Sequence, residues 1–426
     1  MPSTSRGDRS PAPPKGGAGS AMVRRLNASQ VLAALRSEPD EHWSSNDLVD
    51  ATGMSRPTVL AAAQYLVELG WATEHFGRPA QGRGRPARTF AFRAEAGHVL
   101  GLDIGARTAR AAVADLSGRV VAQAECSFRG PDIAARERLD ATVDLAHRAL
   151  REAELPAAAL LAVCAGSSGT VSADGTVRLR TGIPGFLGVD LPAELGAAFP
   201  CPVVAENDCN LATLAERWLG VAAGARDVVC MLGGERLGVG IVLHDTLLRG
   251  HRGGAGELGF LRLMEDSSAG EGVATRARTH GARMVAELAA RGGPSSPDVP
   301  GAALYALSAG DPDAVDARMV FEAVRQHDAA AGELLSAMLG PAARGIATVS
   351  HLLDPELVVV GGAVADAADV LLGPLRGMVA ELVEEPPRLE FSPLRERAVV
   401  LGAVRLALDA AQERFQSLVT APPAGG

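Results

Sequence analysis

The chain has 426 residues, a length typical of two or three domains. Hydrophobic residues make up 47% of the sequence and charged residues 21%, which is enough apolar side chain for a sizeable core. No apolar run approaches the length of a membrane span, the N-terminal residues lack the apolar stretch of a secretory signal, and the five cysteines form no CxxC pair. These features exclude membrane, secreted and fibrous proteins, and we expect a cytoplasmic protein with reduced thiols.

The charge is distributed unevenly along the chain. Residues 1–95 contain 12 Lys and Arg against 9 Asp and Glu, a net charge of +3, so the remaining residues carry −12 and the whole chain −9. A basic N-terminal segment ahead of an acidic body predicts an anionic partner for that segment alone.

The N-terminal residues divide into an arm and a small domain. Residues 1–22 are rich in Pro, Gly and Ser and predict a disordered arm. Residues 23–93 predict a winged helix-turn-helix, because three short amphipathic helices precede two short strands that flank the arginine-rich run GRPAQGRGRPAR. Ser45 and Ser55 are candidate caps of the second and third helices.

The third helix and the loop between the two strands have the chemistry of a DNA-binding surface. A helix N-terminus with Ser55, Arg56 and Thr58 can enter a major groove, and a glycine-arginine loop can enter an A/T-rich minor groove. The predicted DNA-binding residues are Ser55, Arg56, Thr58, Gln64, Arg83 and Arg85. The alternative is a protein-interaction module with a solvated loop, because +3 is only mildly basic; the order of helix-turn-helix, wing and loop favours double-stranded DNA.

The rest of the chain predicts an α/β body in two lobes. Strands are expected at residues 99–103, 109–115, 120–127, 160–165 and 203–205, and a similar order restarts at 227–232, 238–244 and 357–360. We assign the first lobe to residues 97–220, the second to 221–416, and a disordered tail to 417–426. Ligands of such folds bind in the crevice beyond the carboxyl ends of the strands.

Fragments of the sequence, in order behind the predicted winged helix, resemble the ROK family (repressor, open reading frame, kinase). They are the linker that runs into LGLDIG, then ENDCNLATLAE at 206–216, GGAGELGF at 253–260 and LDPELVVVGGAV at 353–364. The resemblance covers about residues 26–412. It implies an actin-like ATPase and sugar-kinase fold with a sugar-binding cleft, in a protein that is either a kinase or a repressor.

Both phosphate loops depart from the family's pattern. The family's DxGGTK reads DIGART at 103–108, so one glycine is lost and an arginine replaces the threonine. The loop that should resemble GTGxGxG contains Glu235 and Arg236, which puts a carboxylate where a γ-phosphate would lie. We therefore expect neither ATP nor any other cofactor to bind.

The family's zinc motif is also missing. In the family a histidine after GExG and three cysteines in a CxCGxxxGC-like run hold the zinc. Here Phe260 occupies the histidine position, and the following LRLMEDSSAGEGVATR contains neither Cys nor His. We expect no metal site.

The resemblance leaves Asn207, Asp208 and Glu257 as a sugar pocket, whose amide and carboxylates suit the hydroxyls of a polyol ring. Asp208 matches the family's general base, which its repressors keep to hold the sugar, and we predict no catalysis by it here. The family's upstream sugar-contacting asparagine corresponds to Gly182, so one contact is lost. In the alternative interpretation Asn207 and Asp208 cap a helix, and Glu257 is a buried carboxylate that holds its loop.

The leading hypothesis is a transcriptional regulator, a repressor, whose inactive kinase-like body senses a sugar or sugar derivative. A homodimer or tetramer is expected, because paired wings that read an inverted repeat with an A/T-rich flank gain area and register. Such a protein would be associated with the nucleoid. One alternative is an ATP-dependent sugar kinase with an added DNA-binding domain, supported by Asp103, Asp208 and Glu257. The other is a regulator without a small-molecule effector, supported by the lost sugar and zinc residues.

Overall fold

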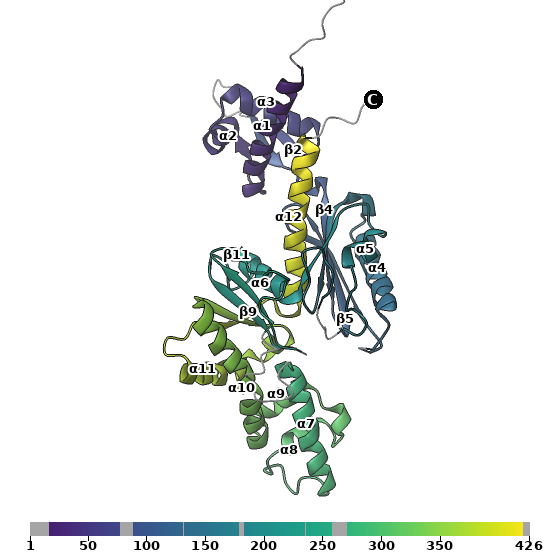
Figure 1. Ribbon diagram of the computed structural model, residues 1–426, viewed down its shortest axis with the longest axis vertical. Coiled ribbons are helices and arrows are strands. Elements are labelled where there is room, and N and C mark those ends of the chain that lie inside the picture. Colours follow the sequence, from purple (N-terminus) through teal and green to yellow (C-terminus); the bar gives the residue numbers. More distant parts are fainter. Residues whose placement is uncertain are drawn as a thin grey trace, which may run out of the picture. The chain divides into compact units, whose positions relative to one another are not determined.

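The computed structural model describes residues 17–76, 88–130, 132–178, 183–234, 236–257 and 271–420. The chain forms two compact units (Figure 1). The first contains Met1–Gly97, Asp115–Ser117 and Ala411–Gly426, and the second contains His98–Ala114 and Gly118–Ala410. Within the described part of the chain, no helix combines the length and the apolar character that a bilayer crossing requires.

The first unit is built from a short antiparallel sheet and helices that pack with it. In its N-terminal described part the helices are α1 (Gly17–Ser37), α2 (Ser45–Thr52) and α3 (Arg56–Glu68). The strands are β1 (Trp43–Ser44), β2 (Ala72–Phe76) and β3 (Arg88–Phe92), in the order β1-β3-β2. Leu35, Leu48, Leu66 and Phe90 come from all three helices and β3 and are fully buried in one apolar core. The predicted helix-turn-helix with wing strands is therefore confirmed.

Local hydrogen bonds define the ends of α2. The Ser44 hydroxyl accepts from the backbone N–H groups of Asn46 and Asp47, and the Asp47 carboxylate accepts from the Ser44 N–H at 2.8 Å. The cap lies one residue before the predicted Ser45, because Ser44 has the extended backbone of β1 and its side chain reaches the first turn. Gly53, at φ +69°, ends α2 in the left-handed conformation that favours glycine.

A helix extends into each of the two segments that were predicted to be disordered. α1 begins at Gly17, inside the predicted arm 1–22, and α12 (Ala398–Thr420) continues into the predicted tail 417–426. The physical reason is that each residue added to an existing helix gains a backbone hydrogen bond at little cost, even where apolar periodicity has ended. Residues 1–16 and 421–426 lie outside the described part of the chain.

The second unit contains two five-stranded sheets of similar design, one in each lobe. The first has the order β6-β5-β4-β7-β8 and consists of β4 (His98–Ile104), β5 (Thr108–Asp115), β6 (Val120–Ser127), β7 (Leu160–Ser167) and β8 (Val203–Asn207). The second has the order β11-β10-β9-β12-β13 and consists of β9 (Val228–Leu232), β10 (Gly238–Leu243), β11 (Thr246–Leu247), β12 (Leu357–Gly361) and β13 (Arg388–Phe391). In each sheet three strands run parallel and an antiparallel hairpin forms one edge.

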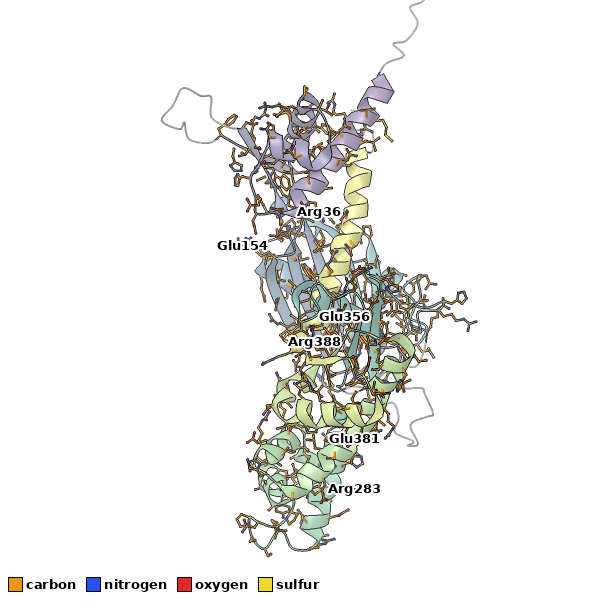
Figure 2. The ribbon with its side chains drawn as sticks, turned by 90° about the vertical axis from the view of Figure 1, so that its left-hand side faces the viewer. Arg36, Glu154, Arg283, Glu356, Glu381 and Arg388 are labelled. Atoms are coloured by element: carbon orange, nitrogen blue, oxygen red, sulfur yellow. The ribbon has the colours of Figure 1, made fainter. Side chains whose placement is uncertain are left out.

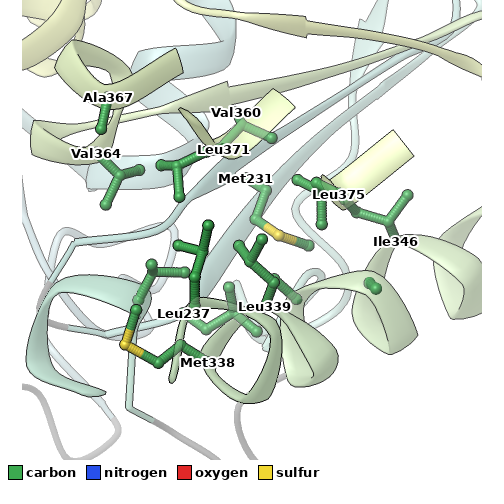
Figure 3. Close-up of a cluster of buried hydrophobic side chains, with 14 of the residues drawn as sticks. Met231, Leu237, Met338, Leu339, Ile346, Val360, Val364, Ala367, Leu371 and Leu375 are labelled. Carbon is green, nitrogen blue, oxygen red and sulfur yellow. The ribbon is translucent and has the colours of Figure 1, made fainter. Parts of the chain in front are cut away.

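Helices cover the two sheets and complete the lobes. The first lobe adds α4 (Ala135–Glu152) and α5 (Leu191–Gly196). The second adds α7 (Val273–Ala290), α8 (Ala302–Leu307), α9 (Ala317–Arg325), α10 (Ala329–Leu353) and α11 (Ala368–Leu382). Figure 3 shows how α10 and α11 pack on β9 and β12, with Met231, Leu339, Ile346, Leu371 and Leu375 buried between them.

Hydrogen bonds from charged residues join the parallel strands at their starts. Figure 2 labels Glu356, the residue before β12, and Arg388, the first residue of β13. The Arg388 N–H donates to the Glu356 carbonyl at 3.3 Å. The Glu356 carboxylate accepts from the backbone N–H of Arg226 at 2.5 Å and of Asp227 at 3.2 Å, just before β9. One side chain thus aligns the beginnings of neighbouring strands.

Two helices depart from the predicted lobe boundaries. α6 (Asp208–Leu219) was expected in the first lobe, but it packs on β9 and β10 of the second sheet. α12 was expected in the second lobe; Ala398 and Leu401 do pack there in one cluster with residues of α6, β9 and β12, but the helix also lies against β4 of the first lobe. A Cβ atom on Gly101 would be 2.6 Å from the Val400 carbonyl oxygen and 2.7 Å from the Val404 nitrogen. An amphipathic pattern shows that a helix has a buried face, but not which sheet it covers.

Candidate DNA-binding surface and ligand-binding cleft

The start of α3 has the polar, exposed character that a DNA-reading helix needs. Ser55 is the N-cap and Arg56 the first residue; both side chains are exposed, and Thr58 is half-buried. The Ser55 hydroxyl lies 2.8 Å from the Thr58 hydroxyl and does not cap the helix backbone. The N-terminal N–H groups, the positive end of the helix dipole, are therefore not covered by the Ser55 side chain, an arrangement that favours a phosphate.

Gln64 has a structural role that the helical pattern did not show. Its side-chain oxygen accepts a hydrogen bond from the guanidinium of Arg88, the first residue of β3. Arg88 also pairs with Glu74 of β2 and lies over the ring of Phe90, 4.9 Å from the ring centre. Gln64 therefore holds α3 to the wing strands. Arg83 and Arg85 lie outside the described residues.

The start of α6 carries two of the residues predicted for the sugar-binding cleft. β8 ends at Asn207, whose side-chain oxygen accepts from the backbone N–H of Cys209 at 2.8 Å and of Asn210 at 3.1 Å. The same amide donates to the Gly169 carbonyl at 3.0 Å and to Oδ1 of Asp208 at 3.1 Å. Asn207 is thus a helix cap, as in the alternative interpretation, and it also orients the adjacent carboxylate.

Three carboxylates of the cleft lie close enough to influence one another. Burial raises the pKa of Asp208 to about 6, against hydrogen bonds from Cys209, and the negative charge of Glu257 adds to the rise. Burial also raises the pKa of Asp103, to about 7, with the Arg110 charge opposing and the Asp208 charge adding to the shift. The structure therefore brings together Asp103, Asp208 and Glu257, which are far apart in the sequence.

Glu257 reaches the cleft on a loop of the second lobe that touches the first. The Thr170 hydroxyl donates to Glu257 at 3.3 Å, and burial raises the pKa of the Glu257 carboxyl while the Arg236 charge lowers it. Gly253 and Gly256, both at positive φ, pass so close to the carbonyl oxygens of Val171 and Val239 that a side chain would overlap them. The glycines of GGAGE are what let this loop lie between the lobes.

Two arginines that were not predicted from the sequence contact the first phosphate loop from neighbouring elements. Arg110 of β5 lies 3.5 Å from Asp103 and also pairs with Glu125 at 3.1 Å and Glu396 at 2.7 Å. Arg138 of α4 is fully buried, and its Nη1 donates to the carbonyl oxygens of Gly105 and Ala106, both at 2.8 Å. An arginine on the buried face of α4 was a signal available in the sequence, whereas nothing local marked Arg110.

A further arginine, Arg249, pairs across the lobes with Glu206 at the end of β8. Its Nε lies 2.6 Å from the Glu206 carboxylate, which also accepts from the Asn207 N–H at 2.9 Å. Neither residue was among the predicted ones, because the motif ENDCN drew attention to its second and third residues only.

The second phosphate loop pairs with the segment that leads into α7. The backbone of Arg236 forms an antiparallel bridge with Glu271, and a Cβ atom on Gly272 would overlap the Gly234 carbonyl. Glu235, Phe260 and Gly182 lie outside the described residues. Among the residues that the structure describes, no three His, Cys, Asp or Glu side chains are grouped to hold a metal. Most of the expected zinc segment is not described, so the absence of zinc remains a prediction.

Known proteins resemble the chain over more than nine tenths of its length. The sequence model of the ROK family matches residues 99–410, and that of the IclR helix-turn-helix domain matches residues 26–75. A glucokinase of Thermotoga maritima is 30% identical over 246 residues, 57% of this chain and 77% of that protein. A xylose repressor of Caldicellulosiruptor bescii is 22% identical over 402 residues, 91% of this chain and 96% of that protein. The solved structure of a ROK family transcriptional regulator, a homologue of the E. coli MLC protein, has a TM-score of 0.71 at 19% identity and covers 94% of this chain and 99% of its own.

These matches agree with the division of the chain into a helix-turn-helix and a two-lobed body. The glucokinase match spans little more than half of this chain, whereas the xylose repressor and the regulator structure match more than nine tenths of it. The predicted fold class is therefore confirmed. The chain belongs to the ROK family, and its helix-turn-helix domain followed by a ROK domain makes it a ROK transcriptional regulator.

Proposed function

We propose that this regulator is a repressor that binds operator DNA through α3 and its wing, and that its kinase-like body binds a sugar or sugar derivative without phosphorylating it. The observation that carries the proposal is the pairing of Asp103 with Arg110. It acts as a homodimer or tetramer on an inverted repeat in the nucleoid, because two copies of α3 gain affinity and register from paired half-sites.

The first phosphate loop does not fit a metal-nucleotide. The family resemblance gives Asp103 the role of handling the metal-nucleotide, but here a guanidinium lies 3.5 Å from one of its oxygens. Arg110 and a magnesium ion would compete for the same lone pairs, and Glu125 and Glu396 hold Arg110 in place. Arg138 binds the loop's carbonyl oxygens from the side of α4.

The other side of the cleft keeps groups suited to hydroxyls. Oδ1 of Asp208 accepts from the backbone N–H of Cys209 and from the side-chain amide of Asn207, and a carboxylate has further lone pairs with which to accept a ligand hydroxyl. Glu257, from the other lobe, supplies a second carboxylate. A polyol held between them would contact both lobes, and it could therefore bind one lobe arrangement more tightly than another.

The test is fluorescence anisotropy of the protein on its own upstream intergenic DNA, titrated with neutral sugars, amino sugars and their phosphates, beginning with D-xylose and D-glucose. We expect one class of sugar to release the DNA, and Asp208→Ala to retain DNA binding but lose this response. DNA binding that no sugar disturbs would favour the regulator without a small-molecule effector. Unchanged affinity in both Arg56→Ala and the Arg83→Ala/Arg85→Ala variant would refute the DNA interface.

The sugar-kinase alternative is supported by the retained Asp208 carboxylate and is tested in the same preparation. The proposal predicts no sugar-dependent ATP turnover. Turnover that disappears in Asp208→Asn would establish a kinase, since the amide keeps the shape of the side chain but cannot accept a proton.

A further inference from the structure

We infer that α12 is the mechanical link between the cleft and the DNA-binding unit. The inference rests on the proposed function, because it names the element through which occupancy of the cleft changes DNA binding. Three observations carry it: the glycine contacts of α12, the tethering of the segment that leads into it, and the unit in which it ends.

α12 touches the two elements that carry Asp103 and Asp208, with no side chain between the backbones. A Cβ atom on Gly402 would overlap the carbonyl oxygen of Leu211, in the first turn of α6, the helix that begins at Asp208. On β4, a Cβ atom on Gly101 would lie 2.6 Å from the Val400 carbonyl, two residues before Asp103. Close-packed interiors transmit displacement rather than absorb it, so a shift of α6 or β4 must move α12.

The segment that leads into α12 is tied to the same two elements by polar groups. Glu396, in the turn Arg395–Arg397 that leads into α12, pairs with Arg110, which in turn pairs with Asp103. On the other side, Ser392 donates to Glu216 of α6. The Ser392 hydroxyl also accepts from the backbone N–H groups of Leu394 and Arg395, both at 3.1 Å, at the start of that turn. This segment is thus bonded both to α6 and to the strand that faces Asp103.

The other end of α12 belongs to the unit that contains α3. The helix has 23 residues, and its part from Ala411 onward clusters with the first unit. At 1.5 Å per residue it is about 34 Å long. If a ligand binds the cleft more tightly in one position of α12 than in another, its binding changes the affinity for DNA. Because such coupling is reciprocal, DNA binding must also change the affinity of the cleft for the ligand.

Reciprocity allows a test that needs no identified effector. Hydrogen–deuterium exchange is measured on the full-length protein with and without its upstream DNA, in the wild type, Gly402→Ala and Gly377→Ala. The last variant is the matched control, because Gly377 lies within α11 and a Cβ atom there would meet nothing within 4 Å. D-xylose and D-glucose are then added to each DNA complex.

In the wild type we expect DNA to change exchange in residues 207–212 and 398–404 by about fivefold or more, the low end of allosteric coupling. Gly402→Ala is expected to bind the DNA but lose this change, together with any sugar response, while Gly377→Ala keeps both. The inference is overturned if wild-type DNA binding leaves residues 207–212 unchanged, or if Gly402→Ala retains the full change. Absence of DNA binding by the wild type would instead refute the proposed regulator itself, so the two failures are distinguishable.

If Gly402→Ala does not fold, Glu396→Gln decides the question. This variant keeps the shape of the side chain and removes the charge that holds Arg110. Its control is Glu390→Gln, because Glu390 has similar side-chain exposure, 37% against 39%, and pairs with Arg376 at 3.7 Å. Loss of the DNA-induced change in Glu396→Gln alone supports the link, and equal behaviour of the two variants overturns it.

Discussion

Arg138→Met tests whether the buried guanidinium of α4 holds the first phosphate loop in place. In the wild type its Nη1 donates to the carbonyls of Gly105 and Ala106, and its guanidinium lies 4.4 Å from the ring centre of Phe128. Methionine fills a similar volume but donates no hydrogen bond. Each carbonyl left without a donor costs about 1–3 kcal/mol, and the lost cation–π contact adds about 0.5–2 kcal/mol.

Removal of a buried charge offsets part of this cost. Burial lowers the pKa of Arg138, which shows that its charged form is disfavoured by its surroundings. We therefore expect a net loss of about 2–4 kcal/mol in the free energy of unfolding of the first lobe. Native-state hydrogen exchange of the slowest amides of β4 and β7 measures this free energy directly. Exchange of residues 104–107 should accelerate more than that of the rest of the sheet.

The control is Arg136→Met, two residues earlier in the same helix. Its side chain is 72% exposed and pairs with Asp140 and Glu194 at the surface, so no measurable loss of stability is expected. If Arg138→Met is as stable as this control, the free energy cost of burying the charge cancels the stabilisation by its hydrogen bonds. Our reasoning about the loop would then be wrong.

Three further predictions concern the DNA interface, the helix cap and the cleft carboxylates. Arg56→Ala should weaken operator binding and reduce the slope of log K against log salt by about one unit, the effect of one lost phosphate contact; an unchanged slope would show that Arg56 does not touch a phosphate. Asn207→Ala should destabilise the second unit by about 1–2 kcal/mol through the lost cap of α6, whereas Asn207→Ser, which keeps a cap acceptor without adding a negative charge beside Asp208, should cost less; equal losses in urea unfolding would contradict the capping role. Because burial raises the pKa of Asp103 to about 7 and of Asp208 to about 6, the folded protein binds protons that the unfolded chain releases above about pH 4. Stability should therefore increase as the pH falls from above 7 toward 5, with a smaller increase in Asp103→Asn; a stability that falls over this range in the wild type would refute the shifts.

The cleft residues could be predicted from the sequence only where they belong to a local motif. Asn207 and Asp208 followed from ENDCN, but their connection to Glu257 depends on a loop of the other lobe. Arg110 could not be found from the sequence, because its partner Glu396 is 286 residues away and the strand around it is composed of small, unremarkable side chains.

The order of the elements and much of their type could be predicted from the sequence, because hydrophobic periodicity and capping are local properties. β6 occupies the predicted 120–127, and the helix-turn-helix lies where its three helical patterns and two strands predicted it. Three features became visible only in the folded chain: α12 covers β4, α6 packs on the second sheet, and Arg110 pairs with Asp103. These features depend on which buried faces and charges meet after the chain has folded. The hydrophobic periodicity of a segment does not show which distant segment it will contact.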